Sequence, residues 1–258
     1  MYLCGQIMEY EIIHIDETDS TNGWLRRNLA TDGHKQLVVM ADFQTAGKGC
    51  GSNSWESERG KNLTFSVLLH PTEIKASWQF RISEAVSVAL CETLEHYFYP
   101  PSTANSSPRI GQLSIKWPND IYVDDRKICG ILIENRLQGS TITDCIVGIG
   151  LNVNQTMFYS DAPNPVSMAQ VLGHETDRDE LLKVFLKVLS EVLKREPEVL
   201  VSDYHSRLYR REGMHRFCDD KGTFEAKVLN VLDDGRLVLF DADGRARIYA
   251  FKEVGFCL

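Results

Sequence analysis

Apolar residues recur every three to four positions in two long segments of the chain, residues 77–98 and 178–194. This period predicts two amphipathic helices, each of which buries one stripe of side chains. The stripe of the first helix contains Phe80, Val86, Leu90, Leu94 and Tyr97. The stripe of the second contains Leu181, Leu182, Phe185, Leu189 and Leu193. Two shorter helices are expected at residues 23–30, which follow a cluster of N-cap residues, and at residues 204–211.

Short runs of aliphatic and β-branched residues predict strands between these helices. The expected strands are residues 10–15, 37–43, 63–69, 113–117, 121–123, 128–133 and 145–153. Asp124 and Asp125 supply turn chemistry between two of them, which predicts a hairpin. Residues 99–112 are rich in proline, serine and asparagine, and this composition predicts a surface loop.

The C-terminal segment has a different pattern of short strands joined by tight turns. Residues 222–231, 236–241 and 245–251 are expected to form three strands, separated by Asp-Gly turns. Such a series predicts a small separate β-barrel. We place the boundary near His215, which gives a larger domain of residues 1–214 and a smaller one of residues 215–258.

Composition narrows the function classes. Hydrophobic residues make up 43% and charged residues 25% of the 258 residues, as in globular proteins. The formal net charge of −8 disfavours broad nucleic-acid binding, which needs a basic surface. We expect a cytoplasmic protein, because the chain lacks both a bilayer-spanning apolar run and the features of a signal peptide. None of the seven cysteines forms a CxxC pair, so we expect reduced thiols, not a disulfide framework or zinc site.

A glycine-rich loop, residues 44–60, follows the strand expected at residues 37–43. Its glycines, at Gly47, Gly49 and Gly51, let the backbone approach a ligand, and Lys48 adds a cation for an anionic group. The order of residues matches neither a P-loop nor a Rossmann fingerprint. On its own, the loop is equally compatible with a flexible turn.

Two further motifs combine charges and glycines with strand ends. The first is Lys116-Trp117-Pro118-Asn119-Asp120, and the next strand returns Lys127 beside it. Taken alone, this motif is also compatible with a hairpin that has a buried tryptophan and solvated charges. The second places Gly148 and Gly150 in an otherwise strong strand that ends at Asn152. Glycines there indicate either close approach of a ligand or a β-bulge.

The order of these motifs resembles the catalytic domain of biotin–protein ligases, also called holocarboxylase synthetases. The order is Ser20-Thr21-Asn22, a QxAGxG loop that ends in Trp55, KWPNDI, RKxxGILIE and GIGLNVN, within residues 12–154. The segment after His215 resembles the small Src-homology-like barrel that closes many members. The resemblance implies an α/β (α+β) fold with a mixed, mostly antiparallel sheet and helices on one side, as in class II synthetase-like biotin/lipoate ligases.

The resemblance also implies an activity. Such ligases use ATP to convert biotin into biotinyl-5′-AMP and pyrophosphate, and then transfer biotin to a lysine of a biotin carboxyl carrier protein. A carboxylate must approach a polyanion, and each unit-charge repulsion at ~4 Å costs about 1 kcal/mol in water and about 4 kcal/mol at an effective dielectric of 20. Lys48, Lys116, Lys127 and Mg²⁺ are the available cations. Mg²⁺ is expected to arrive mainly with ATP, with Asp120 as a candidate protein ligand.

The resemblance assigns roles residue by residue. The implied biotin-binding residues are Ser20, Thr21, Asn22, Gln44, Gly47, Lys48, Lys127, Gly130 and Leu132. The implied ATP-binding residues are Lys48, Trp55, Lys116, Asn119, Lys127 and Asn152, and the implied catalytic residues are Lys127, Lys48 and Asp120. Each also has a structural interpretation: Ser20 or Thr21 as a helix cap, Trp55 as a core anchor, and Lys127 as a surface charge.

One departure and several alternatives accompany this interpretation. Many family members carry the arginine-rich pattern GRGRRGR in the glycine loop, whereas this chain has lysine at Lys48 and no cation at Cys50, Gly51 or Asn53. Lysine keeps the charge but lacks the bidentate fork of arginine, which predicts weaker retention of the adenylate.

A lipoate–protein ligase on the same fold and a non-catalytic biotin- or carrier-binding module are the alternatives. The motifs begin too early for an N-terminal DNA-binding domain, so no DNA binding is expected, and a homodimer is left open.

Overall fold

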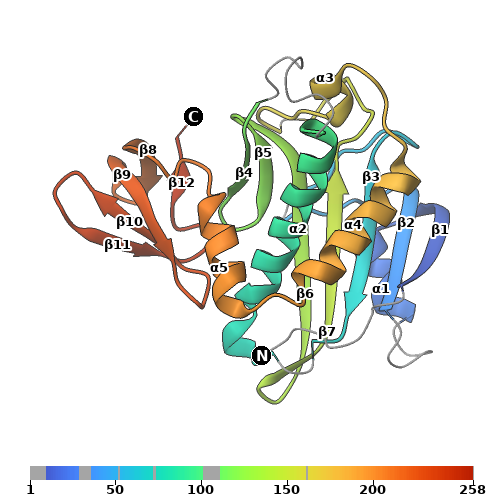
Figure 1. Cartoon of the computed structure of the whole chain (residues 1–258), viewed down its shortest axis with the longest axis horizontal. Helices are drawn as coiled ribbons and strands as arrows, with labels where there is room; N and C mark the ends of the chain where they lie inside the picture. Colours follow the sequence, from blue (N-terminus) through green and yellow to red (C-terminus); the bar gives the residue numbers. More distant parts are fainter. Residues whose placement is uncertain are drawn as a thin grey trace.

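The computed structural model describes residues 10–28, 36–51, 53–71, 74–100, 111–160 and 162–257. Parts of the helix predicted at residues 23–30, of the glycine loop and of the loop predicted at residues 99–112 lie outside these ranges. The described residues form two sheets, and the smaller one lies at one end of the molecule (Figure 1). Among the described residues, no helix combines the length and apolar character needed to cross a bilayer.

The larger sheet has seven strands in the order β1-β2-β3-β7-β6-β5-β4. Its strands are β1 (Tyr10–Thr18), β2 (Gln36–Gln44), β3 (Leu63–Leu69), β4 (Leu113–Lys116), β5 (Asp120–Val123), β6 (Arg126–Gln138) and β7 (Thr141–Leu151). Only the β1–β2 pair is parallel, and every other neighbouring pair in this sheet is antiparallel. The mixed, mostly antiparallel sheet is therefore confirmed.

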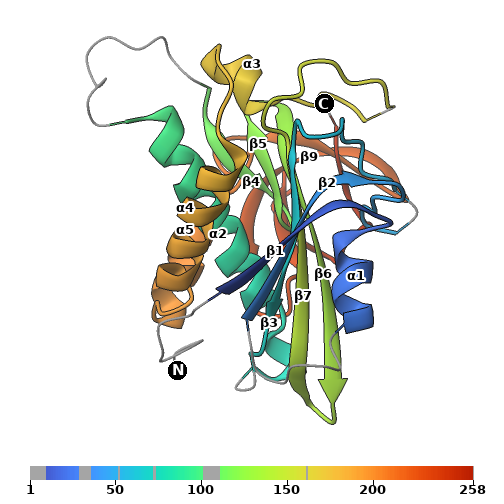
Figure 2. The ribbon, with the colours of Figure 1, turned by 90° about the vertical axis from the view of Figure 1, so that its right-hand side faces the viewer.

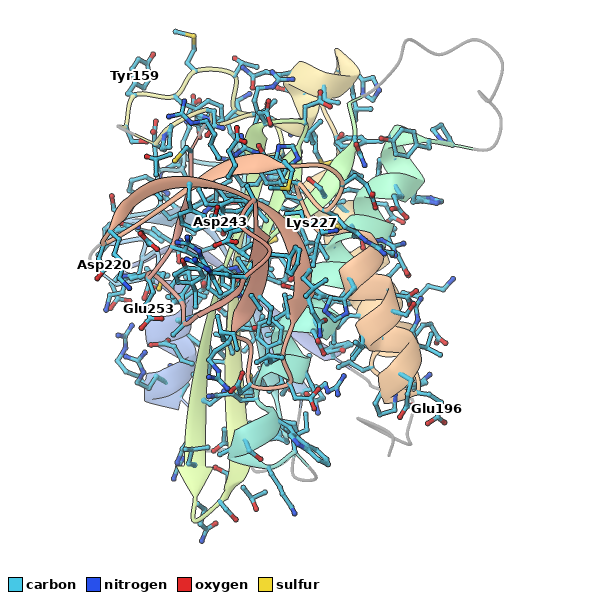
Figure 3. The ribbon with its side chains drawn as sticks, turned by 90° about the vertical axis from the view of Figure 1, so that its left-hand side faces the viewer. Tyr159, Glu196, Asp220, Lys227, Asp243 and Glu253 are labelled. Atoms are coloured by element: carbon cyan, nitrogen blue, oxygen red, sulfur yellow. The ribbon has the colours of Figure 1, made fainter. Side chains whose placement is uncertain are left out.

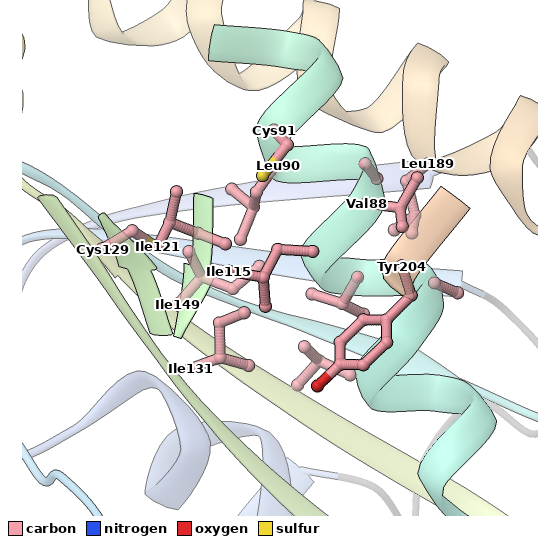
Figure 4. Packing of buried hydrophobic residues seen from close by; sticks show 14 of the residues in the cluster. Val88, Leu90, Cys91, Ile115, Ile121, Cys129, Ile131, Ile149, Leu189 and Tyr204 are labelled. Carbon is pink, nitrogen blue, oxygen red and sulfur yellow. The ribbon is translucent and has the colours of Figure 1, made fainter. Parts of the chain in front are cut away.

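The long helices cover one face of this sheet, as Figure 2 shows edge-on. They are α2 (Phe80–Phe98), preceded by the 3-10 turn η1 (Ala76–Trp78), α4 (Arg178–Val192) and α5 (Pro197–Ser206). Side chains of α2 fill the space between the helix and the strands (Figure 4). The short helix α1 (Thr21–Asn28) packs on the opposite face, through a small cluster of buried aliphatic residues. This second face is the one that carries the candidate site.

One predicted helix was misplaced. The sequence favoured residues 204–211, whereas the structure has α5 at Pro197–Ser206. Pro197 occupies the first turn, where its fixed φ and missing N–H are tolerated, so the proline begins the helix instead of excluding it. The short helix α3 (Met168–Leu172) was not predicted; Ser167 and Gln170 form a capping box at its start.

The smaller sheet confirms the three predicted C-terminal strands and adds two. Its strands are β8 (His215–Asp219), β9 (Gly222–Val231), β10 (Leu237–Asp241), β11 (Ala246–Tyr249) and β12 (Gly255–Phe256). The order is β11-β10-β9-β8-β12, and β8 begins at the proposed boundary residue, His215. Figure 3 shows this sheet from its outer side, where Asp220, Lys227 and Asp243 are exposed. Its inner residues belong to the same hydrophobic cluster as α2 and the large sheet.

A buried carboxylate near the junction of the two sheets predicts a pH effect on stability. Glu84 of α2 is 2% exposed, and burial raises its pKa from 4.5 to about 7 although Arg81 lies 3.3 Å away. The folded state therefore holds this proton up to a higher pH than the unfolded state does. Its contribution to stability is present below about pH 4.5 and is lost as the pH rises toward 7, by up to about 3 kcal/mol.

We expect Glu84→Gln to be more stable than the wild type at pH 8, and the gain to disappear by pH 5. Urea unfolding of both proteins between pH 5 and 8 measures the difference. Glu191→Gln, at an exposed position of α4, is the control for the loss of one carboxylate. A Glu84→Gln curve parallel to that of the wild type would mean that Glu84 ionises normally.

Candidate active site

A cluster of buried polar side chains lies where α1 begins, on the open face of the large sheet. The Ser20 hydroxyl accepts a hydrogen bond from the Gly23 amide at 3.1 Å and caps the helix. The Thr21 amide and hydroxyl both donate to Oε1 of Gln44, at 2.8 and 3.2 Å. The Ser66 hydroxyl, on β3, lies 2.6 Å from the Thr21 hydroxyl. Thr21 thus brings the predicted residue Gln44 together with Ser66, and the predicted residue Ser20 precedes Thr21 at the start of α1.

Asn22 closes the same cluster against β6 and β7. Its Oδ1 accepts from the Ser66 hydroxyl at 2.6 Å, and its Nδ2 donates to Glu134 at 2.8 Å and to the Leu132 carbonyl at 3.4 Å. A Cβ on Gly148 would lie 2.3 Å from Asn22 Oδ1, so only glycine leaves room for this side chain. Ser66 and Glu134 were missed by the sequence analysis. A serine in the mostly apolar strand LTFSVLL was the available signal.

The described residues of the glycine loop, 47–51 and 53–55, form a narrow hairpin, which we call the glycine finger. The Gly49 amide donates to the Asn53 carbonyl at 2.7 Å, and the Trp55 amide donates to the Gly47 carbonyl at 3.0 Å. Lys48 lies on this hairpin, exposed and with no ion pair among the described residues. Gly51 near the tip has φ +72°, and a Cβ there would lie 2.5 Å from Lys252 Nζ of the smaller sheet. The finger therefore reaches from the large sheet to the C-terminal segment.

Trp55, at the end of the finger, lies flat on two facing glycines. Gly130 of β6 and Gly150 of β7 are register partners, and their added Cβ atoms would lie 3.0 and 2.3 Å from the indole ring. The indole Nε1–H is buried and has no hydrogen-bond partner. Both glycines are thus explained by the close approach of Trp55, and the β-bulge interpretation is not needed at this point of the ladder.

A pair of lysines lies next along the strands, at the β4–β5 turn. Lys127 Nζ donates to Asp120 Oδ2 at 2.7 Å and lies 5.9 Å from the centroid of the Trp55 ring. Lys116 Nζ donates to the Tyr122 hydroxyl at 3.1 Å and lies 5.4 Å from the centroid of the Phe256 ring. Burial lowers the pKa of Lys116; the neighbouring Lys127 acts in the same direction, whereas Asp120 opposes it.

The turn that carries these charges is held from below by α5. Tyr204 is fully buried, and its hydroxyl donates to the Pro118 carbonyl at 2.7 Å. Trp117 is also buried, and its Nε1–H donates to the Gly235 carbonyl of the smaller sheet at 2.8 Å. Asn119, the next residue after Pro118, is half-buried. The structure therefore places Lys116, Asn119, Asp120 and Lys127 in one region, as predicted.

Asn152 lies just beyond the end of β7. Its Nδ2 donates to the Val166 carbonyl at 3.1 Å, whereas its Oδ1 is buried and receives no hydrogen bond. A buried acceptor without a partner carries a desolvation cost that a ligand donor could remove. The buried Oδ1 without a partner therefore makes Asn152 a candidate contact for a bound molecule.

These features form a row along the β6–β7 pair. Gly148 lies beside the polar cluster, Gly150 lies under Trp55, and Asn152 ends the row. Alternate residues of a strand face the same side and are about 6.6 Å apart, so the row from Gly148 to Asn152 is about 13 Å long. Lys127 flanks the row from β6: its Nζ pairs with Asp120 and would lie 3.3 Å from a Cβ on Gly130. This length and order fit an extended molecule with a polar head and an anionic tail.

The described residues contain no group of three or more histidine, cysteine, aspartate or glutamate side chains able to hold a metal ion. In the row, Asp120 uses Oδ2 for Lys127, and its Oδ1 stays available as one oxygen ligand. One carboxylate suits an Mg²⁺ ion that keeps waters and phosphate oxygens as its other ligands. The six described cysteines, Cys50, Cys91, Cys129, Cys145, Cys218 and Cys257, are free thiols.

Comparison with known proteins agrees with this geometry. Residues 15–152 match the model of the biotin/lipoate A/B protein ligase family. The chain is 29% identical over 255 residues to the bifunctional ligase/repressor BirA of Bacillus subtilis, covering 95% of this chain and 73% of the relative. It is 30% identical over 169 residues to the biotin–[acetyl-CoA-carboxylase] ligase of Paracoccus denitrificans, covering 64% of this chain and 65% of the relative.

Solved structures agree as well. The biotin protein ligase from Aquifex aeolicus in complex with biotin and ATP is similar with a TM-score of 0.72 and 27% identity, covering 95% of this chain and 97% of that one. The biotin protein ligase from Leishmania major in complex with biotinyl-5-AMP has a TM-score of 0.65 at 22% identity, covering 93% of this chain and 98% of that one. The second likeness supports the fold.

Proposed function

The chain belongs to the biotin/lipoate A/B protein ligase family, and from this premise we propose that it is an ATP-dependent biotin–protein ligase. The observation that carries the proposal is the row along β6 and β7: a polar cluster, a tryptophan on two glycines, paired cations and an unpartnered amide oxygen. Biotin has a polar ureido head, an apolar chain and a carboxylate, and the adenylate adds a phosphate and a base. The row offers the polar cluster for the head, the cations for the carboxylate and phosphate, and Trp55 with Asn152 for the base.

The polar cluster is the proposed pocket for the ureido head. The hydroxyls of Ser20, Thr21 and Ser66 can each donate or accept, and the Gln44 amide can do both. A ureido group has one carbonyl and two N–H groups, so it needs this kind of mixed partner. Asn22 is already bonded to Ser66 and Glu134, and we assign it the role of orienting the pocket. Gly47 and Leu132 border the cluster. Gly47 lies beside the Gln44 side chain, and the Leu132 carbonyl accepts a hydrogen bond from Asn22.

The cations are the proposed activation centre. In the first step, a biotin carboxylate oxygen attacks the α-phosphorus of ATP, the bond from that phosphorus to the bridging oxygen breaks, and pyrophosphate leaves. Lys127 and Lys116 lie where negative charge accumulates, and Lys48 adds a third cation from the finger. Mg²⁺ supplies further neutralisation of the phosphates. Charge fixed in advance in this way is usually the largest catalytic contribution.

The second step transfers the acyl group. The amine of a carrier lysine attacks the acyl carbon, and the bond between that carbon and the phosphate oxygen breaks. AMP leaves, and the amine loses one proton. Asp120, with one carboxylate oxygen free of Lys127, is the proposed acceptor or guide for that amine. At the far end, Asn152 Oδ1 can accept from the amino group of adenine, and Trp55 offers an aromatic face. Asn119 is the proposed polar contact to the phosphates.

We propose a biotin carboxyl carrier protein as the partner and the cytoplasm as the compartment, where ATP is supplied and thiols stay reduced. A homodimer, which the sequence leaves open, is not part of this proposal. The first experiment incubates the protein with biotin, Mg-ATP and a biotin carrier domain, and probes the carrier with streptavidin. Labelling is the expected result. Tight biotin binding without labelling would favour a non-catalytic module, and neither binding nor labelling would redirect the assay to lipoate.

The finger sequence leads to a separate prediction on retention of the intermediate. Replacing Lys48 by arginine restores a bidentate donor, which typically adds about one net hydrogen bond, or ~1 kcal/mol. We therefore expect Lys48→Arg to slow the release of biotinyl-AMP roughly fivefold. Rapid filtration of the enzyme after a single turnover measures the release. Lys221→Arg, at an exposed position of the smaller sheet, should not change it, and equal release from Lys48→Arg would contradict the prediction.

A further inference from the structure

The residue after Trp55 makes an unusual set of contacts with a distant loop. The carboxylate of Glu56 accepts from the backbone amides of Tyr159 and Ser160, at 2.9 and 2.8 Å, and from Gln155 Nε2 at 3.3 Å. These donors belong to residues 154–160, which follow the end of the row at Asn152; we call this segment the adjoining loop. One side chain therefore connects the base of the glycine finger to the loop at the other end of the site.

Gln155 holds the same loop from inside. Its side chain is 2% exposed; Oε1 accepts from the Glu58 amide at 2.9 Å and from Asn62 Nδ2 at 2.7 Å. Its Nε2 also donates to the Met157 carbonyl at 2.7 Å. Since Glu58 and Asn62 lie just after the finger, Glu56 and Gln155 form two polar ties between the same two segments.

The adjoining loop buries little apolar surface. Of its three large apolar or aromatic residues, Met157 and Tyr159 are 59% and 82% exposed and Phe158 is half-buried, and Tyr159 projects from the molecule in Figure 3. A segment with little buried apolar surface opens at low cost unless other contacts restrain it. The restraint here comes from hydrogen bonds to a charged acceptor, which are stronger than those between neutral groups.

We propose that Glu56 is a positioning residue that holds the adjoining loop closed beside the adenylate and couples its closure to Trp55. The proposal rests on the proposed function, because it names how that site keeps its intermediate. Through this tie the loop stays next to Asn152 and Trp55, the two groups assigned to the nucleotide. The tie also offers a way to retain the adenylate in a chain whose finger lacks the arginines of many relatives.

The ionised form of Glu56 fits this role. Burial raises its pKa, but the hydrogen bonds from Ser160, Tyr159 and Gln155 lower it more, and the net shift is downward. The carboxylate is therefore charged at neutral pH, with both oxygens available as acceptors. Glutamine keeps the shape of the side chain but replaces one acceptor oxygen by an NH₂ group. It can therefore accept hydrogen bonds from only some of the three donors.

The test compares Glu56→Ala and Glu56→Gln with Glu58→Ala, in which an exposed carboxylate two residues away is removed. For Glu56→Ala we expect the KM for ATP to rise about tenfold, since hydrogen bonds to charged groups are of this order. The KM for biotin should stay within about twofold, because the polar cluster is untouched. Release of biotinyl-AMP should accelerate, Glu56→Gln should be intermediate, and Glu58→Ala should match the wild type.

A second measurement needs no catalysis. Hydrogen exchange of residues 154–160 in the ligand-free protein should speed up in Glu56→Ala and in Gln155→Ala, and the double variant should add little to either. Unchanged exchange would overturn the proposed tie, whatever the activity. Faster exchange with unchanged ATP kinetics would overturn its role in the reaction. A wild-type protein that forms no biotinyl-AMP would refute the proposed function. Hydrogen exchange would still test the tie between Glu56 and the adjoining loop.

Discussion

Replacement of Lys127 by alanine is expected to lower the rate of biotinyl-AMP formation by roughly 10²–10³-fold, the cost of removing one fixed charge-stabilising donor. Lys127 Nζ lies 2.7 Å from Asp120 and 5.9 Å from the centre of the Trp55 ring, so it sits between the proposed acyl and nucleotide positions. Its side chain is 31% exposed, and its removal should therefore cost little stability. Biotin-dependent pyrophosphate exchange measures the first step without the carrier.

Two comparisons make this prediction specific. Lys187→Ala removes an exposed lysine of α4, on the opposite face of the sheet, and should keep full activity. Asp120→Asn keeps the shape of the ion-pair partner but removes its charge, and should retain more of the first step than Lys127→Ala. If Lys127→Ala kept more than a tenth of the wild-type rate of pyrophosphate exchange, Lys116 and Lys48 would be sufficient to stabilise the charge in the first step. In that case Lys127 would be only a structural partner of Asp120.

The parts of the site that were predicted are those whose residues are close in sequence. Lys116 and Asp120 are joined by one turn, and Lys127 follows after one short hairpin, so local strand and turn chemistry places them together. The glycines of the β7 strand were also recognisable, because glycine in a strong strand indicates close approach. The sequence could not say that the approaching group is Trp55 for one glycine and Asn22 for the other.

The missed parts depend on contacts between distant segments. Ser66 meets Asn22 across 44 positions, and Glu56 meets Ser160 across 104. Neither pairing follows from local propensity, because each requires the strand order of the sheet to be known first. The same holds for α5: its Tyr204 supports Pro118 from 86 positions away, so its role emerges only from packing. A polar residue inside an apolar strand, such as Ser66, is the local sign of such a contact.

Two glycines on one strand allow the row of subsites to be divided by experiment. Gly148 and Gly150 lie on the same face of β7, but a Cβ on Gly148 would contact Asn22, and one on Gly150 would contact Trp55, each at 2.3 Å. Alanine is compatible with a strand, so the main effect of either change is displacement of one neighbour. We expect Gly150→Ala to lower adenylate formation about 100-fold, since a displacement of about 1 Å in such a site can cost this much.

Gly148→Ala should instead act on the polar cluster: the KM for biotin should rise while the KM for ATP changes little. In Gly150→Ala the larger loss should fall on the nucleotide and the chemical step, because Trp55 lies beside Lys127. Steady-state kinetics with biotin and ATP varied separately distinguishes the two patterns, and circular dichroism checks that both variants fold. Equal effects of the two alanines on both substrates would mean that the polar cluster and Trp55 do not occupy separate subsites, and the order of the row would have to be abandoned.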